Sequence, residues 1–295
     1  MRIKPWAAMA AAVPVAATCL ATTPAAAAAT KAPKVPAGTT AGWVVFDRTS
    51  GKIVSHRNAH RKFRSASVVK IMIAIDYLES HRKVPATDAA LLKVMLRSSN
   101  DNAATSFWSR DGKGAIITRV ARKLGLSDTA PPPAGFPGFW GYTSLSAYDV
   151  VRTYRYLLDT ASPRVRDTIL GHLRASTPCG SDGFDQTFGI PSAVPKPWAV
   201  KQGWSGFGDV PPVRCTAGRT GSGAAVTPAN AGGITVKQGN GVPDYGRPVL
   251  HTTGLIGKGD RYVVAVLTAH PAGGTWRSSV SRVTQLTRDL YRDAT

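Results

Sequence analysis

The sequence is poor in acidic residues and has no long apolar run beyond its first 30 residues. Its 295 residues include 37 Lys and Arg against 17 Asp and Glu, a formal net charge of +20, and Glu79 is the only glutamate. After residue 30 no apolar run approaches the roughly 20 residues of a membrane-spanning helix, so a membrane-spanning fold is not expected. Hydrophobic residues still make up 43% of the chain. A packed core is therefore expected, and wholesale disorder is excluded.

Several common active-site motifs are also missing. The chain has no Walker-type phosphate loop and no G-x-G-x-x-G after a strand, and Phe207 breaks a G-x-S-x-G motif around Ser205. His56 and His60 have the i,i+4 spacing of a metal pair, but basic residues surround them and no acidic ligand is near. We therefore expect neither a metal nor a cofactor.

The first 29 residues have the composition of an export signal. Arg2 and Lys4 form a basic head, an apolar alanine-rich run follows, and residues 24–29 supply small side chains for a signal peptidase. We expect a signal peptide at 1–29, a flexible lead-in at 30–40 and one domain at 41–295 of a secreted, extracytoplasmic protein, with cell-wall association as an option. The alternatives are an uncleaved anchor and a lipid-modified Cys19, although Thr18 is untypical before a lipidated cysteine.

Cleavage after residue 29 would leave Cys179 and Cys215 as the only cysteines. Two cysteines in an oxidising compartment favour one disulfide, with two buried free thiols as the alternative. Two cysteines alone cannot form a zinc site.

Positive charge is densest at residues 56–64. Outside the cell the available polyanions are cell-wall polymers and anionic lipid head groups, and a basic surface without a specific partner is the alternative. No recognition motif for nucleic acid accompanies the charge, so nucleic acid is not an expected partner. We expect a monomer.

Hydrophobic periodicity predicts two strands, then helices, then three strands and a last helix. Strands are predicted at 42–47, 52–55, 198–201, 249–253 and 261–268. Helices are predicted at 67–79, 87–97, 102–108, 115–124, 146–158, 164–173 and 278–291, with a long proline- and aromatic-rich loop at 126–142. This order predicts an α/β (α+β) fold in which the N-terminal hairpin and the C-terminal strands form one antiparallel sheet, with a helical layer inserted between them.

Ser67 and Lys70 lie one helical turn apart at the start of the apolar segment 67–79. Residues three apart share a helix face, so the hydroxyl and the amine are expected to meet. A serine becomes a good nucleophile when a base takes its proton, and a desolvated lysine loses its charge readily enough to be that base. The spacing predicts a nucleophile at Ser67, with a snorkelling Lys70 as the alternative.

Two further elements would complete such a site. One element is a serine-rich turn, which can be taken as Ser99-Asn100-Asp101 or as the overlapping Ser98-Ser99-Asn100. Either choice puts a hydroxyl and an amide or carboxylate on one turn. The alternative to a catalytic role is ordinary helix capping by these side chains. Lys201-Gln202-Gly203 lies on a predicted strand, where the lysine offers charge to a substrate carboxylate and the glycine allows close approach. Lys237-Gln238-Gly239 is a rival for this element, and His251-Thr252-Thr253-Gly254 is a weaker one.

Together, S-x-x-K, a serine-rich turn and K-x-G near a late strand follow the order of the penicillin-recognising serine enzymes. From about residue 41 to 293 the chain resembles the serine β-lactamase and D-Ala-D-Ala peptidase superfamily, in its class A β-lactamase-related branch, which implies a β-lactamase-like fold. The residues that the resemblance marks as catalytic are Ser67, Lys70 and Ser99. Those that it marks as substrate-binding are Asp101, Lys201, Gln202, Gly203 and Trp204.

The same resemblance implies a mechanism. Ser67 would be acylated, Lys70 and Ser99 would handle protons, Lys201 would capture a substrate carboxylate, and the N–H of Trp204 would join that of Ser67 in an oxyanion hole. Asp101 stands where the family has Asn, and Gln202 where it has a hydroxyl residue.

Class A β-lactamases also use a loop glutamate to direct water, and the corresponding loop 126–142 has only Asp128. An acyl-enzyme should then hydrolyse slowly. We expect an exported serine acyl hydrolase that acts on cell-wall D-alanyl peptides or related amides. The alternatives are a β-lactamase and a catalytically silent cell-wall-binding protein with this fold.

Overall fold

The computed structural model describes residues 33–216, 240–243 and 245–294, which belong to the unit Pro33–Thr295. The expected signal peptide, Cys19 and the rival phrase Lys237-Gln238-Gly239 lie outside the described residues.

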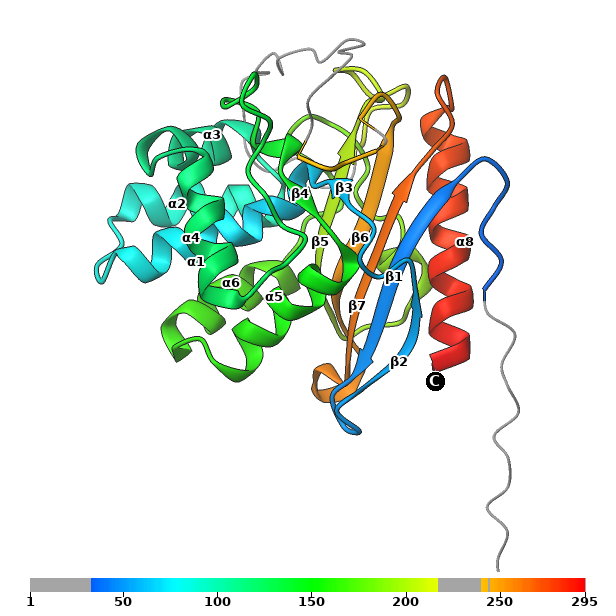
Figure 1. Ribbon diagram of the computed structural model, residues 1–295, viewed down its shortest axis with the longest axis horizontal. Helices are drawn as coiled ribbons and strands as arrows, with labels where there is room; N and C mark the ends of the chain where they lie inside the picture. Colours follow the sequence, from blue (N-terminus) through cyan, green and yellow to red (C-terminus); the bar gives the residue numbers. More distant parts are fainter. Residues whose placement is uncertain (1–32, 217–239, 244, 295) are drawn as a thin grey trace, which may run out of the picture. The chain divides into compact units, whose positions relative to one another are not determined.

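A five-stranded antiparallel sheet has the strand order β2-β1-β7-β6-β5 (Figure 1). Its strands are β1 (Thr40–Asp47), β2 (Lys52–Arg57), β5 (Trp198–Ser205), β6 (Val249–Ile256) and β7 (Tyr262–Ala269). β1 begins inside the expected lead-in and pairs with β7 along its whole length. The predicted meeting of the N-terminal hairpin with the C-terminal strands is therefore confirmed.

A tight turn between β1 and β2 starts the sheet. The Asp47 carboxylate accepts hydrogen bonds from the Thr49 N–H at 2.9 Å and the Ser50 hydroxyl at 3.2 Å. Gly51 closes the turn with φ +68°, a left-handed conformation that favours glycine.

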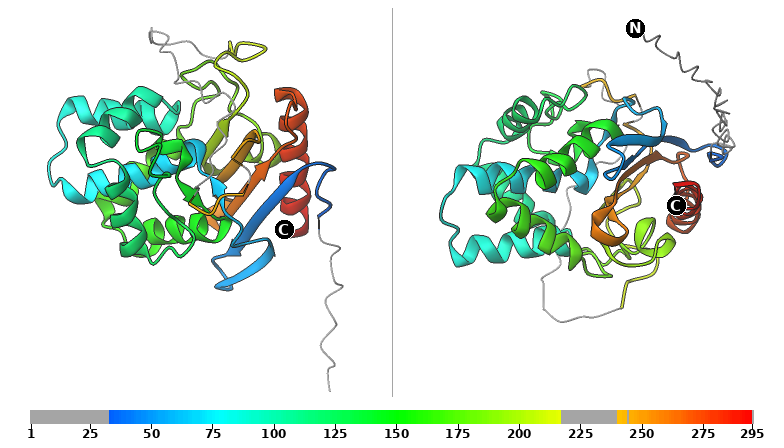
Figure 2. Two further views of the ribbon diagram at one scale, coloured as in Figure 1. Left: turned by 45° about the horizontal axis from the view of Figure 1, so that its top comes forward. Right: turned by 90° about the horizontal axis from the view of Figure 1, so that it is seen from below.

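The two faces of the sheet carry different helices. Alternate residues of β1 point to opposite sides: Val44 and Phe46 pack with the helical layer, whereas Trp43 and Val45 pack with α8 (Trp276–Ala294). Figures 1 and 2 show the helical layer on one side of the sheet and α8 on the other. The short helix α7 (Ile190–Ala193) packs with α8.

Six helices make up the described part of the helical layer, with two short strands beside them. The helices are α1 (Lys70–Ser80), α2 (Ala86–Arg97), α3 (Asp101–Arg110), α4 (Gly114–Leu124), α5 (Ala147–Asp159) and α6 (Pro163–Arg174). The strands β3 (Phe63–Arg64) and β4 (Ser144–Leu145) pair antiparallel. As the sequence predicts, Ser146 caps α5, because its hydroxyl accepts the N–H of Asp149 at 3.1 Å.

The central helix α1 is buried on every side from Lys70 to Leu78. The sequence predicts that this helix begins at Ser67, but residues Ala66–Val69 instead form the 3₁₀ turn η1, and the α-helix begins at Lys70. Ala66 enters the turn with φ +45°, and the Val68 N–H bonds to the carbonyl of Ser65, the i→i+3 bond of a 3₁₀ turn. Ser67 therefore sits on a tight turn at the head of a rigid, buried helix.

Candidate functional site

Ser67 and Lys70 lie together where η1 passes into α1. The Lys70 Nζ donates to the Ser67 Oγ at 2.8 Å. Lys70 is fully buried and Ser67 is only 6% exposed. The three-residue spacing thus places a hydroxyl beside an amine in a nearly water-free environment.

Ser99 enters this cluster from the junction between α2 and α3. Its backbone has φ +59°, an uncommon conformation for a residue other than glycine. The Ser99 Oγ accepts from the Lys201 Nζ at 2.7 Å and from the Lys70 Nζ at 3.3 Å.

The side chains on either side of Ser99 make hydrogen bonds outside this cluster. Ser98 bonds to the carbonyl of Val94 at 3.0 Å, and the Asn100 side chain caps α3 by accepting the N–H of Ala103 at 2.8 Å. Of the two registers, the one that begins at Ser99 places its serine in the cluster.

Asp101, the first residue of α3, completes the surroundings of Lys70. Its Oδ1 lies 2.6 Å from the Lys70 Nζ, and its side chain is 48% exposed. Lys70 also donates to the carbonyl of Ser99 at 2.6 Å. Burial lowers the pKa of Lys70, and the charge and hydrogen bond of Asp101 raise it in opposition.

Lys201 reaches the cluster from β5, the edge strand of the sheet. It is 1% exposed, and its Nζ also donates to its neighbour's carbonyl, that of Gln202, at 3.1 Å. Burial lowers the pKa of Lys201 well below its usual range, and the charge of Lys70 lowers it further. Two amines therefore converge on one serine hydroxyl.

The Gln202 side chain lies apart from the cluster. Side chains alternate across a strand, and the Gln202 amide donates to the carbonyl of Phe188, on the side of α7, while its Oε1 has no partner among the described residues. Only its backbone carbonyl touches the cluster. The expected substrate contact of this side chain is not supported by its position.

Gly203 lets β5 approach the turn that carries Ser67. A Cβ added at Gly203 would lie 3.1 Å from the carbonyl oxygen of Ser65 and 3.3 Å from the Ser67 nitrogen. A side chain there would push the strand away from η1 by a few tenths of an ångström, so glycine favours the close approach.

Trp204 is half-buried beside this contact, and its indole N–H donates to Asp182 at 2.8 Å. Burial raises the pKa of Asp182. The sequence does not predict this contact of Asp182 with a candidate site residue, because Asp182 lies in an irregular segment and nothing in the pattern relates it to β5.

The disulfide expected from the sequence joins Cys179 to Cys215. It links the segment that carries Asp182 to the chain that follows β5, and the Cys215 N–H also bonds to the carbonyl of Gly183 at 2.9 Å.

The loop 126–142 supplies an aromatic ring instead of a carboxylate. Trp140 places its ring centroid 4.6 Å from the Lys70 Nζ, a cation–π contact, and its indole N–H donates to Thr105 at 3.1 Å. The only carboxylate of the loop, Asp128, instead pairs with His60 at 2.8 Å. Glu79 lies at the far end of α1, where it pairs with Lys123. Sequence reasoning treated Trp140 only as part of a loop.

The basic segment 56–64 does not form one exposed patch. Arg64 is 4% exposed and donates to the carbonyl of Arg247 at 2.8 Å. Arg57 lies over the ring of Trp43. Arg64 therefore lies inside the fold, where a backbone carbonyl accepts a hydrogen bond from its guanidinium.

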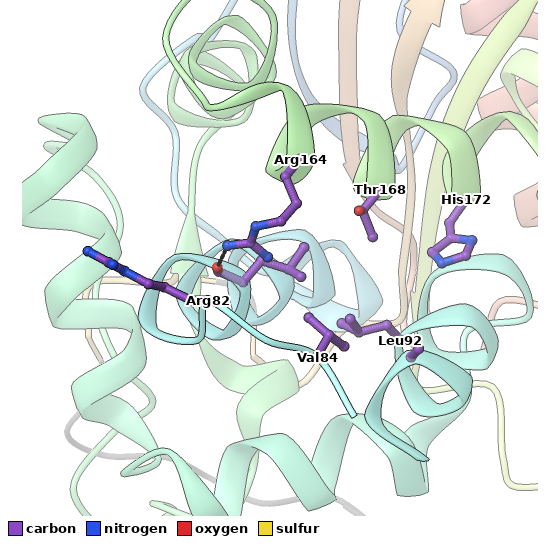
Figure 3. Close-up of a pocket in the computed structure, with 8 residues that line it drawn as sticks. Arg82, Val84, Leu92, Arg164, Thr168 and His172 are labelled. Carbon is purple, nitrogen blue, oxygen red and sulfur yellow. Dashed lines mark hydrogen bonds between the residues drawn. The ribbon is translucent and has the colours of Figure 1, made fainter. Parts of the chain in front are cut away.

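A separate cavity of about 280 Å³ lies between α1, α2 and α6 (Figure 3). Leu92, Thr168 and His172 line it, and the Arg164 guanidinium donates to the carbonyl of Leu78 at its wall. Leu78 is eight residues beyond Lys70, about 12 Å along the helix axis. None of the predicted site residues lines this cavity.

Within residues 33–216, 240–243 and 245–294, no group of three or more His, Cys, Asp or Glu side chains could hold a metal ion. In the same ranges, no helix has the length and apolar character needed to cross a membrane.

Comparisons with known proteins give relatives for part of the chain and structural neighbours for most of it. No protein-family model matches. A 148-residue part is 47% identical to "Putative lipoprotein LppW" of Mycobacterium tuberculosis (strain ATCC 25618 / H37Rv), which is 48% of this chain and 46% of that protein. The protein of the same name from Mycobacterium bovis gives the same values. The aligned part thus spans about half the length of these relatives.

Among solved structures, PBP-A has a TM-score of 0.59 at 16% identity, over 87% of this chain and 90% of its own. A class A β-lactamase from Mycobacterium abscessus also has a TM-score of 0.59, at 18% identity, over 86% of this chain and 94% of its own. At such identities the likeness shows the fold. The chain therefore has the β-lactamase-like fold that its motifs imply.

Proposed function

We propose, from the fold that this chain shares with class A β-lactamases and PBP-A, that it is an exported serine acyl hydrolase. Its substrates would be cell-wall D-alanyl peptides or related amides, opened through an acyl-enzyme on Ser67. The observation that carries the proposal is the buried chain of hydrogen bonds from the Ser67 Oγ through the Lys70 Nζ and the Ser99 Oγ to Lys201. A hydroxyl linked in this way can lose its proton as it attacks a carbonyl.

The surroundings of Ser67 support slow release of the acyl group. Hydrolysis of an acyl-enzyme requires a base that activates water. The loop 126–142 brings the ring of Trp140 against Lys70, and its carboxylate, Asp128, pairs with His60 instead. We therefore propose peptide cleavage or transfer rather than efficient β-lactamase turnover.

The backbone around Ser67 offers a place for a developing oxyanion. η1 leads into the N-terminus of α1, and the edge strand β5 lies against η1 at Gly203. We propose that the N–H groups of Ser67 and Trp204 stabilise the negative oxygen of the tetrahedral intermediate.

Export is part of the proposal. Its support is the composition of residues 1–29 and the likeness of half the chain to proteins named as lipoproteins. In an extracytoplasmic setting, cell-wall peptides would be the substrate, and anionic cell-wall polymers could interact with the positive charge of the chain.

Labelling with a fluorescent penicillin tests the acylation. The wild-type protein should carry the label on Ser67, S67A should carry none, and nitrocefin turnover should be slow. S98A is a matched control for S99A, because Ser98 points away from the cluster; S99A should lose labelling and S98A should keep it. Folded wild-type protein that takes up no label would favour the silent binding protein, and fast nitrocefin turnover would favour the β-lactamase.

A further inference from the structure

Two buried amines share one serine hydroxyl. The Lys70 Nζ and the Lys201 Nζ both bond to the Ser99 Oγ, so they lie no more than about 6 Å apart. Both side chains are almost completely withdrawn from water. Two positive charges this close in a poorly solvated environment repel each other, so a charge on one amine disfavours a charge on the other.

The contacts of Lys70 are those of an ammonium. Its three closest acceptors are the Ser99 carbonyl at 2.6 Å, the Asp101 carboxylate at 2.6 Å and the Ser67 Oγ at 2.8 Å. An ammonium has three N–H donors and no lone pair, which matches three acceptors. The ring of Trp140 adds a further site that favours positive charge.

Among the residues that the structure describes, no carboxylate lies within ion-pair distance of Lys201. Its contacts are the Ser99 hydroxyl at 2.7 Å and the Gln202 carbonyl at 3.1 Å. The charged groups that act on it are Lys70, which lowers its pKa, and the more distant Asp101 and Asp182, which raise it; burial is the largest influence and lowers it. The unpaired amine is therefore the one that loses its proton.

We infer that Lys201 is the terminal proton acceptor for Ser67, and that Asp101 brings this about by holding Lys70 as an ammonium. This inference rests on the proposed function. It gives Lys201 a different role from the carboxylate capture that the family resemblance implies. It also gives a purpose to Asp101, which stands where the family has Asn.

The proposed proton transfer follows these hydrogen bonds and conserves the number of protons. Lys70, an ammonium without a lone pair, first gives a proton to the Ser99 Oγ while Ser99 gives its own proton to the neutral amine of Lys201. Lys70 is then a neutral amine, and it accepts the proton of the Ser67 Oγ as that oxygen bonds to the substrate carbonyl carbon. Ser67 becomes bonded to the acyl carbon, Lys201 becomes an ammonium, and Lys70 and Ser99 end unchanged. When the leaving amine departs, Ser99 donates its proton to that amine and regains one from Lys201, which becomes neutral again.

The substitution K201R separates the two roles, because arginine keeps a positive charge but cannot act as a base. We would measure the rate of Ser67 labelling by fluorescent penicillin from pH 5 to 10, for wild type and K201R, with folding checked by circular dichroism. If Lys201 accepts the proton, K201R loses about 100- to 10,000-fold in rate, the usual contribution of a general base, and loses the rise of rate with pH. A K201R rate within tenfold of wild type, or one that keeps the wild-type pH profile, overturns the inference.

The substitution D101N keeps the size of the side chain and removes its charge. It tests the inference independently if K201R does not fold. Without the carboxylate the pair of amines holds a second proton less readily, so the rise of rate should move to lower pH. An unchanged profile overturns the role of Asp101.

Nuclear magnetic resonance of lysine labelled with ¹³C at Cε tests the proton distribution without any substrate. At pH 7 the signal of Lys201, assigned by its loss in K201R, should be that of a neutral amine, and Lys70 that of an ammonium. If Lys201 is neutral and Lys70 charged, but the protein takes up no fluorescent penicillin, the proposed function alone is refuted. If the protein takes up fluorescent penicillin but Lys201 is charged, the inference alone is refuted.

Discussion

The close approach of β5 to η1 predicts an unusual response to a single added methyl group at Gly203. In G203A the new Cβ would lie 3.1 Å from the Ser65 carbonyl oxygen and 3.3 Å from the Ser67 nitrogen, both backbone atoms. Overpacking of this kind costs about 1–3 kcal/mol. Replacing a strand glycine by alanine returns about 0.5–1 kcal/mol through the unfolded chain. The net expectation is a loss of up to about 2.5 kcal/mol in the free energy of unfolding.

The same substitution should also slow acylation. Relief of the contact requires β5 or η1 to move by a few tenths of an ångström, which displaces Ser67 from Lys70 and Ser99. A misplacement of 1 Å in an active site costs about 100-fold in rate, so we expect a loss of roughly several-fold in the labelling rate. Urea unfolding and the kinetics of penicillin labelling measure the two effects.

Gly171 provides the matched control. It lies in α6, where an added Cβ would meet nothing within 4 Å. G171A should therefore stabilise the protein by about 0.5–1 kcal/mol, the helix-propensity gain of alanine over glycine, and leave labelling unchanged. If G203A proved as stable and as quickly labelled as G171A, the packing of β5 on η1 would not constrain the site and the reasoning would be refuted.

Three further predictions concern stability. Burial lowers the pKa of His251 to about 4 and that of His270 to about 3. Because the unfolded chain binds these protons at higher pH, each histidine should lower the free energy of unfolding by about 2 kcal/mol between pH 7 and pH 5. Urea titration measures the sum, about 4 kcal/mol, and a flat profile would contradict it. The disulfide closes a loop with a sequence separation of 36; C215S should lose about 4 kcal/mol, and an unchanged urea midpoint under non-reducing conditions would argue against the bond. I75A removes a fully buried side chain of α1 and should cost about 2–5 kcal/mol, whereas I53A, at an exposed position of β2, should cost less than about 1 kcal/mol; equal losses would contradict the burial of α1.

Elements that depend on local pattern agree with the sequence. The apolar run after Ser67 predicts a helix buried on all sides, and α1 is buried from Lys70 to Leu78. The predicted strands pair as one antiparallel sheet. Where the local prediction failed, at the start of this helix, the reason is also local: the positive φ of Ala66 leads into a 3₁₀ turn before the α-helix begins.

The position of single side chains was less predictable. Gln202 follows Lys201 directly, but strand alternation turns it to the opposite side of the sheet. Arg64 belongs to a basic stretch that reads as surface, yet it is buried against backbone carbonyls. The side to which Gln202 points follows from strand alternation, but which elements cover that side does not. The burial of Arg64 likewise depends on the segments that cover β3, and the sequence of the strand does not contain that information.

The sequence by itself determined the order of strands and helices, the buried helix and the proximity of Ser67 to Lys70, because these follow from the periods of strand and helix. Only the tertiary structure decided that Ser99, rather than Ser98, meets Lys201, that Asp101 pairs with Lys70, and that Trp140 covers it. These contacts join residues 31 to 102 positions apart in the chain. Such separations are bridged by the packing of α1 against α3 and of β5 against η1, and the local pattern of hydrophobic and polar residues does not record how those elements pack.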